Sequence, residues 1–232
     1  MQTFSIKNIK VHSFASSSQL IEYADSVKGI LVAVNAEKVI NANQKLIDII
    51  NSNIGYCDGA GAVKAAHRKG EASAVRIPGC ELWLEIVSKF YKSKSFYLVG
   101  ATQQVVKQTV EKLKSEYPGI NIVGWRDGYI NSVSEENKLI EDIVSRKPDV
   151  VFVAMGSPKQ ELLMSMMQEV HKAIYQGLGG SFDLYIGNFK RAPRLLQLYG
   201  CEWIWRFMVQ PTRLKRLYPY LKYAFLLYTG RL

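Results

Sequence analysis

The sequence predicts an α/β fold: a Rossmann-like, mostly parallel sheet flanked by helices, followed by a basic, aromatic C-terminal helical appendage. Two observations predict the sheet. Strand-like runs alternate with helix-like segments, and the run GILVAVN (29–35) is apolar throughout, as in a strand buried on both faces. A third predicts the appendage, because residues 184–232 hold nine Lys and Arg against one acid, which is +8 of the net +10. We expect an α/β core at 1–190 and a helical membrane-association appendage at 191–232.

The composition is that of an ordinary globular protein. The chain has 232 residues, 48% hydrophobic and 22% charged, enough for one large domain with a sizeable core. No run of 18 apolar residues occurs and the N-terminus lacks an apolar signal core, so neither a membrane span nor secretion is expected. Cys57, Cys80 and Cys201 are widely spaced, which predicts reduced thiols. The scattered histidines show no ligand spacing, so we expect no metal and no cofactor.

The body is predicted element by element from apolar runs and their boundaries. Strands are expected at 29–35, 95–100, 120–125, 149–156 and 173–180, and helices at 43–51, 102–119, 134–147 and 158–170. Pro118 and Gly119 end the second helix, Ser134 is the expected N-cap of the third, Pro148 stops it, and Pro158 lies in the first turn of the fourth. Repeated strand–helix–strand units imply parallel strands covered by helices.

Several loops with unusual residues follow these strands. Ligands of open α/β sheets bind beyond the carboxyl ends of the strands. Asn35 and Gly100 each stand at such an end, and the loops MGSPKQE (155–161) and GLGGSFD (177–183) follow two others. We therefore expect these loops to converge at one edge of the sheet.

Two of these loops suit a phosphorylated ligand, although each has a purely structural interpretation. Gly156, Ser157 and Pro158 could open a helix whose free N–H groups hold a diphosphate, or could form a well-capped turn. Gly179 and Gly180 could make a tight turn, or could admit a sugar or nucleotide against bare backbone. Neither a dinucleotide-binding glycine motif nor a P-loop occurs, so those functions are disfavoured.

Asp58, in YCDGAGAV, is the candidate catalytic residue. It lies between a short strand-like piece and a glycine-rich helix start, where it could be a helix N-cap or a general base. No D-x-D pair occurs in the chain, and this pair commonly holds the metal of metal-dependent sugar-nucleotide enzymes. A metal-independent mode is therefore favoured.

Motifs spread across nearly the whole chain resemble one enzyme family. They are LVAVNAEKV, YCDGAGAV, VRIPGCELW, FYLVG, NIVGWRDGY, VAMGSPKQE, GLGGSFD with KRAP, EWIWRF with QPTRLKR, and YTGRL. In this order they resemble the WecG/TagA/CpsF glycosyltransferase family, and within it the members that transfer N-acetyl-D-mannosaminuronic acid in enterobacterial common antigen synthesis. The chain departs from the expected pattern in having Cys57 before Asp58 and Ala60 after Gly59.

The resemblance implies an inverting transfer from a UDP-sugar donor to GlcNAc carried on undecaprenyl pyrophosphate. Asp58 matches the proposed general base, which would take the proton of the acceptor C4 hydroxyl. A uronate donor needs a cation, for which Lys64, Arg68 and Arg76 are candidates, whereas a surface ion pair is the structural alternative for Arg76. The expected substrate-binding set is Asn35, Arg76, Gly100, Gly156, Ser157, Gln160, Gly179, Gly180 and Asp183.

The C-terminal segment predicts contact with a membrane surface. Leu214, Leu217, Tyr218, Leu221, Phe225 and Tyr228 follow helical spacing beside basic residues, as in a helix lying on anionic lipid. Pro219 could divide this segment into two helices, and the apolar stripe could instead pack on the core. The resemblance places Arg206, Arg213 and Arg216 at the lipid pyrophosphate, and Lys215 is a further candidate for contact with the pyrophosphate or the membrane. It implies a peripheral enzyme on the cytoplasmic face of the bacterial inner membrane.

Two alternatives stay open. One is the same-family transfer of N-acetylmannosamine or another hexose to a polyprenyl-linked acceptor. The other is a nucleic-acid-binding module built on the basic, aromatic tail. The tail shows no recognisable RNA- or DNA-binding motif and the loops at the strand ends would go unused, so we expect no nucleic acid. A homo-oligomer is compatible with the sequence.

Overall fold

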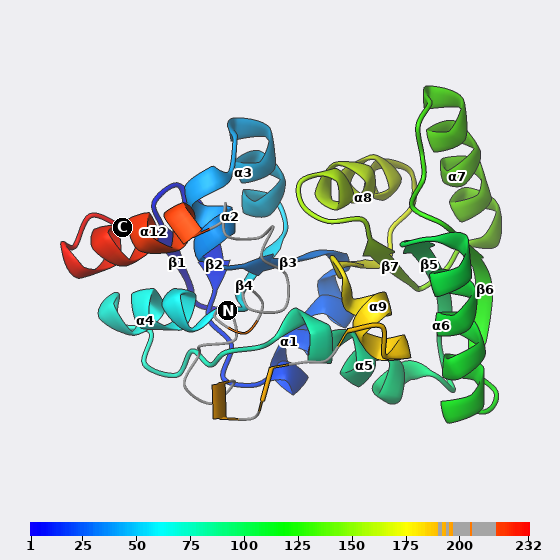
Figure 1. Cartoon of the computed structure of the whole chain (residues 1–232), viewed down its shortest axis with the longest axis horizontal. Helices are drawn as coiled ribbons and strands as arrows, with labels where there is room; N and C mark the ends of the chain where they lie inside the picture. Colours follow the sequence, from blue (N-terminus) through cyan, green and yellow to red (C-terminus); the bar gives the residue numbers. More distant parts are fainter. Residues whose placement is uncertain (190–191, 194, 197–204, 206–216) are drawn as a thin grey trace.

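A parallel β-sheet forms the centre of the protein (Figure 1). The computed structural model describes residues 1–189, 192–193, 195–196, 205 and 217–232. Within them the main sheet has six strands in the order β4-β3-β8-β7-β5-β6, and every neighbouring pair is parallel. The strands are β3 Gly29–Val34, β4 Ile54–Cys57, β5 Ser95–Gly100, β6 Asn121–Arg126, β7 Val150–Ala154 and β8 Ile174–Gly177.

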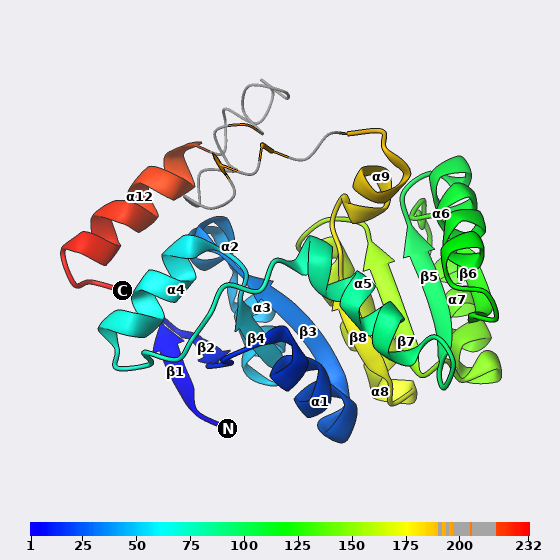
Figure 2. The ribbon, with the colours of Figure 1, turned by 90° about the horizontal axis from the view of Figure 1, so that it is seen from below.

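Helices cover both faces of this sheet, as the sequence predicts (Figures 1 and 2). One face carries α2 Ala36–Asn41, α3 Gln44–Asn51, α4 Ala60–Arg68, α7 Val133–Arg146 and α8 Lys159–Val170. The other carries α1 Ser17–Val27, α5 Gly79–Phe90, α6 Gln103–Glu116 and α9 Ser181–Ile186. The central strands are buried on both sides, and all residues of β7 are inaccessible, which explains why its sequence is apolar without alternation.

An N-terminal hairpin covers the sheet beside β4. Strands β1 Thr3–Ile6 and β2 Ile9–His12 pair antiparallel, and β2 packs against β4. The approach is so close that a Cβ atom at Gly55 would lie 2.7 Å from the Lys10 carbonyl oxygen. Glycine is therefore required at position 55 for the hairpin to reach the strand.

The start of α7 differs from the expected position. Ser132, and not Ser134, is its N-cap: the Ser132 hydroxyl accepts the Glu135 N–H at 3.3 Å. The Glu135 carboxylate in turn accepts the Asn131 N–H at 2.7 Å. Only Ser132 has a glutamate three residues later, as in a capping box, although here the carboxylate returns to the residue before the cap. The helix at 158–170 also differs slightly, because Pro158 is the N-cap and α8 begins at Lys159.

Helix α12 Leu217–Tyr228 packs against α2 and α4 (Figure 2). Tyr223 and Leu227 are buried in this contact, and the Tyr223 hydroxyl donates to the Gly61 carbonyl at 3.0 Å. The helix is continuous through Pro219, so Pro219 does not divide it into two helices.

Four residues of the predicted apolar stripe are on the outer face of α12, whereas Leu217 is half-buried and Leu214 lies outside the described residues. Tyr218, Leu221, Phe225 and Tyr228 are each 60% to 66% exposed. The stripe that packs on the core is thus a different one, while the stripe expected at a membrane surface remains accessible.

Candidate active site

The loops that follow the parallel strands lie together along the carboxyl edge of the sheet, the upper edge in Figure 2. Asp58 follows β4 and Asn35 follows the adjacent β3. Gly179 and Gly156 follow the next two strands, β8 and β7, and Gly100 ends β5. The predicted convergence of these loops is confirmed, and the order of the strands fixes the order of the residues.

The half-buried Asp58 carboxylate is held between two elements. Its Oδ1 atom accepts the N–H of Gly79, the first residue of α5, at 2.8 Å. Its Oδ2 atom accepts a longer hydrogen bond, 3.4 Å, from the Asn35 amide. The N-cap of the following helix is Gly59, without a side-chain cap, so Asp58 stabilises the start of α5 and not of its own helix.

Asn35 and Arg76 both fix Asp58 in place. Asn35 is the N-cap of α2: its Oδ1 atom accepts the Lys38 N–H at 3.0 Å, which turns its amide nitrogen toward Asp58. Arg76 donates from Nε to the Asp58 carbonyl oxygen at 3.0 Å. Thus the side chain and the main chain of Asp58 each have a polar anchor.

Two further buried polar side chains, those of Tyr56 and Gln176, lie next to Gly79 at the start of α5. Tyr56 is on β4, and its hydroxyl would lie 3.0 Å from a Cβ atom at Gly79. Gln176 on β8 donates to the Gly79 carbonyl oxygen at 3.1 Å. Burial, and after it the Asp58 carboxylate, raise the pKa of Tyr56 well above its ordinary value. The start of α5 is therefore supported from below as well as by Asp58.

Gln160 connects the two glycine loops. Its side chain is 5% exposed, and Oε1 accepts the N–H groups of Gly156 at 3.1 Å and of Gly179 at 2.9 Å. A Cβ atom at Gly177 would lie 2.3 Å from the Gln160 Nε2 atom, so glycine at 177 makes room for the amide. In this structure the amide oxygen joins the loops after β7 and β8, and the expected role of Gln160 in substrate binding stays a prediction.

The glycines of the edge fall into two kinds. Gly156 and Gly179 have φ values of +78° and +58°, and no atom lies within 4 Å of a Cβ built on them or on Gly180. These three line open space. Gly100 is different, since its Cβ would lie 2.3 Å from the Ala154 carbonyl oxygen, and glycine is needed there for strand packing itself.

Ser157 and Asp183 lie at the mouths of the helices that follow these loops. Ser157 is exposed just before α8. Asp183 is half-buried in the first turn of α9, and its Oδ1 atom accepts a hydrogen bond from the Asn188 amide at 2.9 Å.

A buried ion pair between α2 and α8 was not predicted from the sequence. The Lys38 ammonium on α2 lies 2.6 Å from the Glu161 Oε1 atom on α8, and the side chains are only 8% and 1% exposed. Burial is the largest influence and raises the pKa of Glu161, but the charge of Lys38, together with hydrogen bonds from Lys38, Gln160 and Ser157, lowers the pKa overall. The residues are separated by 122 others, so no local pattern in the sequence pairs them.

The family comparison agrees with this geometry. The model of the glycosyl transferase WecG/TagA/CpsF family matches residues 3–232. The chain belongs to this family. It is therefore a glycosyltransferase, with a sugar donor and an acceptor, and four of the motifs that resemble the family, LVAVNAEKV, YCDGAGAV, VAMGSPKQE and GLGGSFD, lie at the carboxyl edge.

Several predicted residues of the transferase fall outside the described residues. Arg206, Arg213, Lys215 and Arg216 are all among them, so their expected contact with a lipid pyrophosphate stays a prediction. Neither Cys57 nor Cys80 forms a disulfide bond. Burial, followed by the Asp58 carboxylate, raises the pKa of Cys57 to about 12, which keeps this thiol protonated at neutral pH.

Across the part of the chain that the structure describes, no three His, Cys, Asp or Glu side chains gather as a metal site. In the same residues, no helix has the length and apolar character needed to cross a bilayer.

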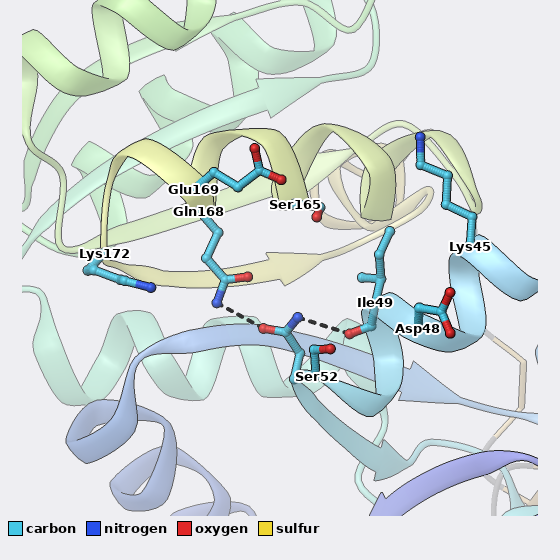
Figure 3. A pocket seen from close by; sticks show the side chains of 9 residues that line it. Lys45, Asp48, Ile49, Ser52, Ser165, Gln168, Glu169 and Lys172 are labelled. Carbon is cyan, nitrogen blue, oxygen red and sulfur yellow. Dashed lines mark hydrogen bonds between the residues drawn. The ribbon is translucent and has the colours of Figure 1, made fainter.

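A polar groove of the transferase lies elsewhere, between α3 and α8 (Figure 3). Gln168 donates to the Asn53 side-chain oxygen at 2.9 Å, and the Asn53 amide donates to the Ile49 carbonyl at 2.9 Å. Asn53 directly precedes β4, and Lys172, which also lines the groove, precedes β8. The groove thus belongs to the amino-terminal side of the sheet, away from Asp58.

Proposed function

We propose that this glycosyltransferase moves N-acetyl-D-mannosaminuronic acid from its UDP-sugar to undecaprenyl-pyrophosphoryl-GlcNAc, with inversion at the anomeric carbon. The observation that carries the proposal is the Asp58 carboxylate, fixed by the Gly79 N–H and the Asn35 amide at the carboxyl edge. A single positioned carboxylate is what an inverting displacement requires as its base.

The geometry favours Oδ2 of Asp58 as the atom that takes the proton. Oδ1 already accepts the 2.8 Å bond from Gly79, whereas Oδ2 has only the 3.4 Å bond from Asn35. In the step, Oδ2 removes the proton of the acceptor C4 hydroxyl as its oxygen bonds to the anomeric carbon. The bond from that carbon to the UDP oxygen breaks, and UDP leaves with the electron pair. A positioned base contributes typically about 10²–10⁴-fold to such a step.

The donor diphosphate fits the glycine loops after β7 and β8. Gly156, Gly179 and Gly180 border open space, so a ligand can approach their backbone closely. The N-terminus of the twelve-residue α8 faces the same place and favours negative charge. These features offer the leaving UDP oxygens a site built from backbone dipoles, which supports a metal-independent mechanism.

The structure narrows the candidates for the cation that would bind the uronate. Arg68 donates to the Leu227 carbonyl oxygen, and its guanidinium lies 5.1 Å from the centre of the Tyr228 ring, so it serves the contact with α12. Lys64 is exposed on α4, the helix that begins directly after Asp58 and Gly59. Lys64 and Arg76 therefore remain the candidates that favour a uronate donor.

The outer face of α12 supports a lipid-linked acceptor. Its exposed apolar and aromatic side chains lie next to Lys222, on a helix packed against α4. Such a face suits the headgroup region of an anionic membrane. We accordingly place the enzyme at the cytoplasmic face of the bacterial inner membrane as a peripheral protein.

Product analysis tests the proposal. The protein is incubated with undecaprenyl-pyrophosphoryl-GlcNAc and a panel of UDP-sugars, and lipid products are identified by mass spectrometry. We expect transfer of N-acetyl-D-mannosaminuronic acid above all others and unchanged activity in EDTA. If N-acetylmannosamine or another hexose were transferred preferentially, the donor proposed here would be wrong. Loss of activity in EDTA with rescue by Mg²⁺ or Mn²⁺ would contradict the metal-independent mechanism.

A further inference from the structure

On the side of the carboxyl edge that carries Asp58, hydrogen bonds lead from this residue to the buried charged side chain of Lys38. Asn35 donates to the Asp58 carboxylate and accepts the backbone N–H of Lys38. The Lys38 side chain leaves the same short helix, α2, and its ammonium donates to Glu161 Oε1 at 2.6 Å. Asp58 is thus linked through α2 to the start of α8.

Hydrogen bonds from the glycine loops that would bind the sugar donor lead to the same Glu161 oxygen. The Gln160 amide nitrogen donates to Glu161 Oε1 at 3.1 Å, while the amide oxygen of Gln160 holds the N–H groups of Gly156 and Gly179. One carboxylate oxygen therefore joins the hydrogen bonds of the β3–β4 loops to those of the β7–β8 loops. The other oxygen of Glu161 is buried without a hydrogen bond of good geometry in the described residues, and the Ser157 hydroxyl is close enough to help lower the pKa of this carboxyl.

We propose that the Lys38–Glu161 ion pair is a positioning element that sets the Asp58 carboxylate relative to the glycine loops holding the donor. The inference rests on the proposed function, in which Asp58 is the base and these loops bind the UDP-sugar. Neither side chain touches the reacting atoms. Their effect is on geometry, where a misplacement of about 1 Å can cost about a hundredfold in rate.

The charge of Lys38 has a second consequence. Glu161 lies in the first turn of α8, where an anionic side chain competes with a bound diphosphate for the favourable helix N-terminus. Lys38 neutralises this carboxylate and so preserves the anion site. Removing Lys38 should therefore weaken UDP binding, whereas removing both partners should not.

The test compares Lys38→Met, Glu161→Met and the double variant, with Lys94→Met as matched control. Lys94 pairs with Asp25 at a similar 2.6 Å and is 16% exposed, but precedes β5 at the other end of the sheet. Each site variant should lower kcat by about ten- to a hundredfold. The double variant should be no slower than the worse single one, because all three remove the same link. Glu161→Gln, which keeps the acceptor oxygen, should retain most of the rate.

Measurements of UDP affinity and of stability against pH distinguish a positioning role of the ion pair from a general loss of stability. UDP affinity should fall in Lys38→Met and recover in the double variant. The stability contributed by the lowered pKa of Glu161 is present above the ordinary glutamate pKa and lost as pH falls through the lowered value. In Lys38→Met burial should raise this pKa, so stability should fall as pH rises. Asn35 and Gln160 are neutral, and Tyr56 is the other titratable group that responds to Glu161.

Amide hydrogen exchange provides a readout that needs no substrate. Lys38→Met should speed exchange at both 35–39 and 156–161, and Lys94→Met at neither. If the single variants do not fold, the double variant carries the test, since apolar replacement of a buried pair is often tolerated. The proposal is overturned if kcat falls no more than in Lys94→Met, or if exchange changes only at 35–39. If no UDP-sugar is transferred by the wild type, the proposed function fails and exchange alone judges the ion pair.

Discussion

Side chains form the β3–β4 half of the carboxyl edge, whereas backbone and glycine form the β7–β8 half. Asp58 is fixed by Asn35 and Gly79 and stands beside a helix that α12 covers. Gly156 and Gly179 border open space and are held from behind by Gln160. The difference matches the two tasks of a transferase, because a base must be held in one orientation while a diphosphate needs close access to backbone dipoles.

The largest effect is expected on the side-chain half. Asp58→Asn keeps the shape of the side chain and an oxygen that can accept the Gly79 N–H, but loses the base. Turnover should fall by about 10²–10⁴-fold, while UDP affinity, which depends on the other half, should stay within about twofold of wild type. Steady-state kinetics and UDP titration measure the two halves separately. Turnover near that of wild type would remove Asp58 from the mechanism.

Deleting the residues after Arg206 removes α12, and so tests the role of the helix that covers α2 and α4 beside Asn35 and Asp58. Tyr223 and Leu227 would no longer be buried against α2 and α4, at a cost of about 1.5–3 kcal/mol for each fully buried side chain. The truncated core should still bind UDP through its glycine loops and should lose transfer to the long-chain lipid acceptor. Transfer at the full rate would show that α12 serves only packing.

Gly177→Ala disturbs the backbone half alone. The added methyl group would collide with the Gln160 amide, from which its Cβ would be 2.3 Å away. We expect a loss of about 1–3 kcal/mol in unfolding free energy and weaker UDP binding, since the amide no longer joins the two loops. Gly180→Ala, where the new methyl group meets no atom within 4 Å, is the matched control for stability. Equal unfolding midpoints for the two variants would contradict the role of Gln160.

The smallest effect is expected from a single hydroxyl group. Tyr223→Phe removes the hydrogen bond to Gly61 and should lower the unfolding free energy by about 0.5–1.5 kcal/mol in a urea titration. Tyr218→Phe on the exposed face of the same helix should leave the stability unchanged. If the unfolding free energy of Tyr223→Phe were higher than that of wild type, the packing of α12 in solution would not depend on this hydrogen bond.

The fold and the location of the site could be predicted from the sequence because local signals carried them. The apolar run at Val150–Ala154 marked a buried strand, and the polar residues at strand ends were brought together by the parallel sheet. The Lys38–Glu161 pair and the position of Gln160 between two loops could not be predicted, because they depend on how distant helices meet.

The orientation of α12 could not be predicted for a different reason. The helix is apolar on both sides: Tyr223 and Leu227 form one stripe, and Leu221 and Phe225 belong to another. A helix with a single apolar face has only one surface to bury, but here two were available. Only the shape of α2 and α4, with Gly61 admitting the Tyr223 ring, decides between them.

The hairpin beside β4 has a consequence for how the protein behaves at high concentration. An uncovered edge strand invites pairing with another chain and so leads to aggregation. Here the Lys10 carbonyl lies against Gly55, on the strand that leads directly into Asp58. A larger side chain at position 55 would force the Lys10 backbone, and with it the hairpin, to shift away from that strand. Colloidal stability and the placement of the candidate base therefore depend on the same missing methyl group.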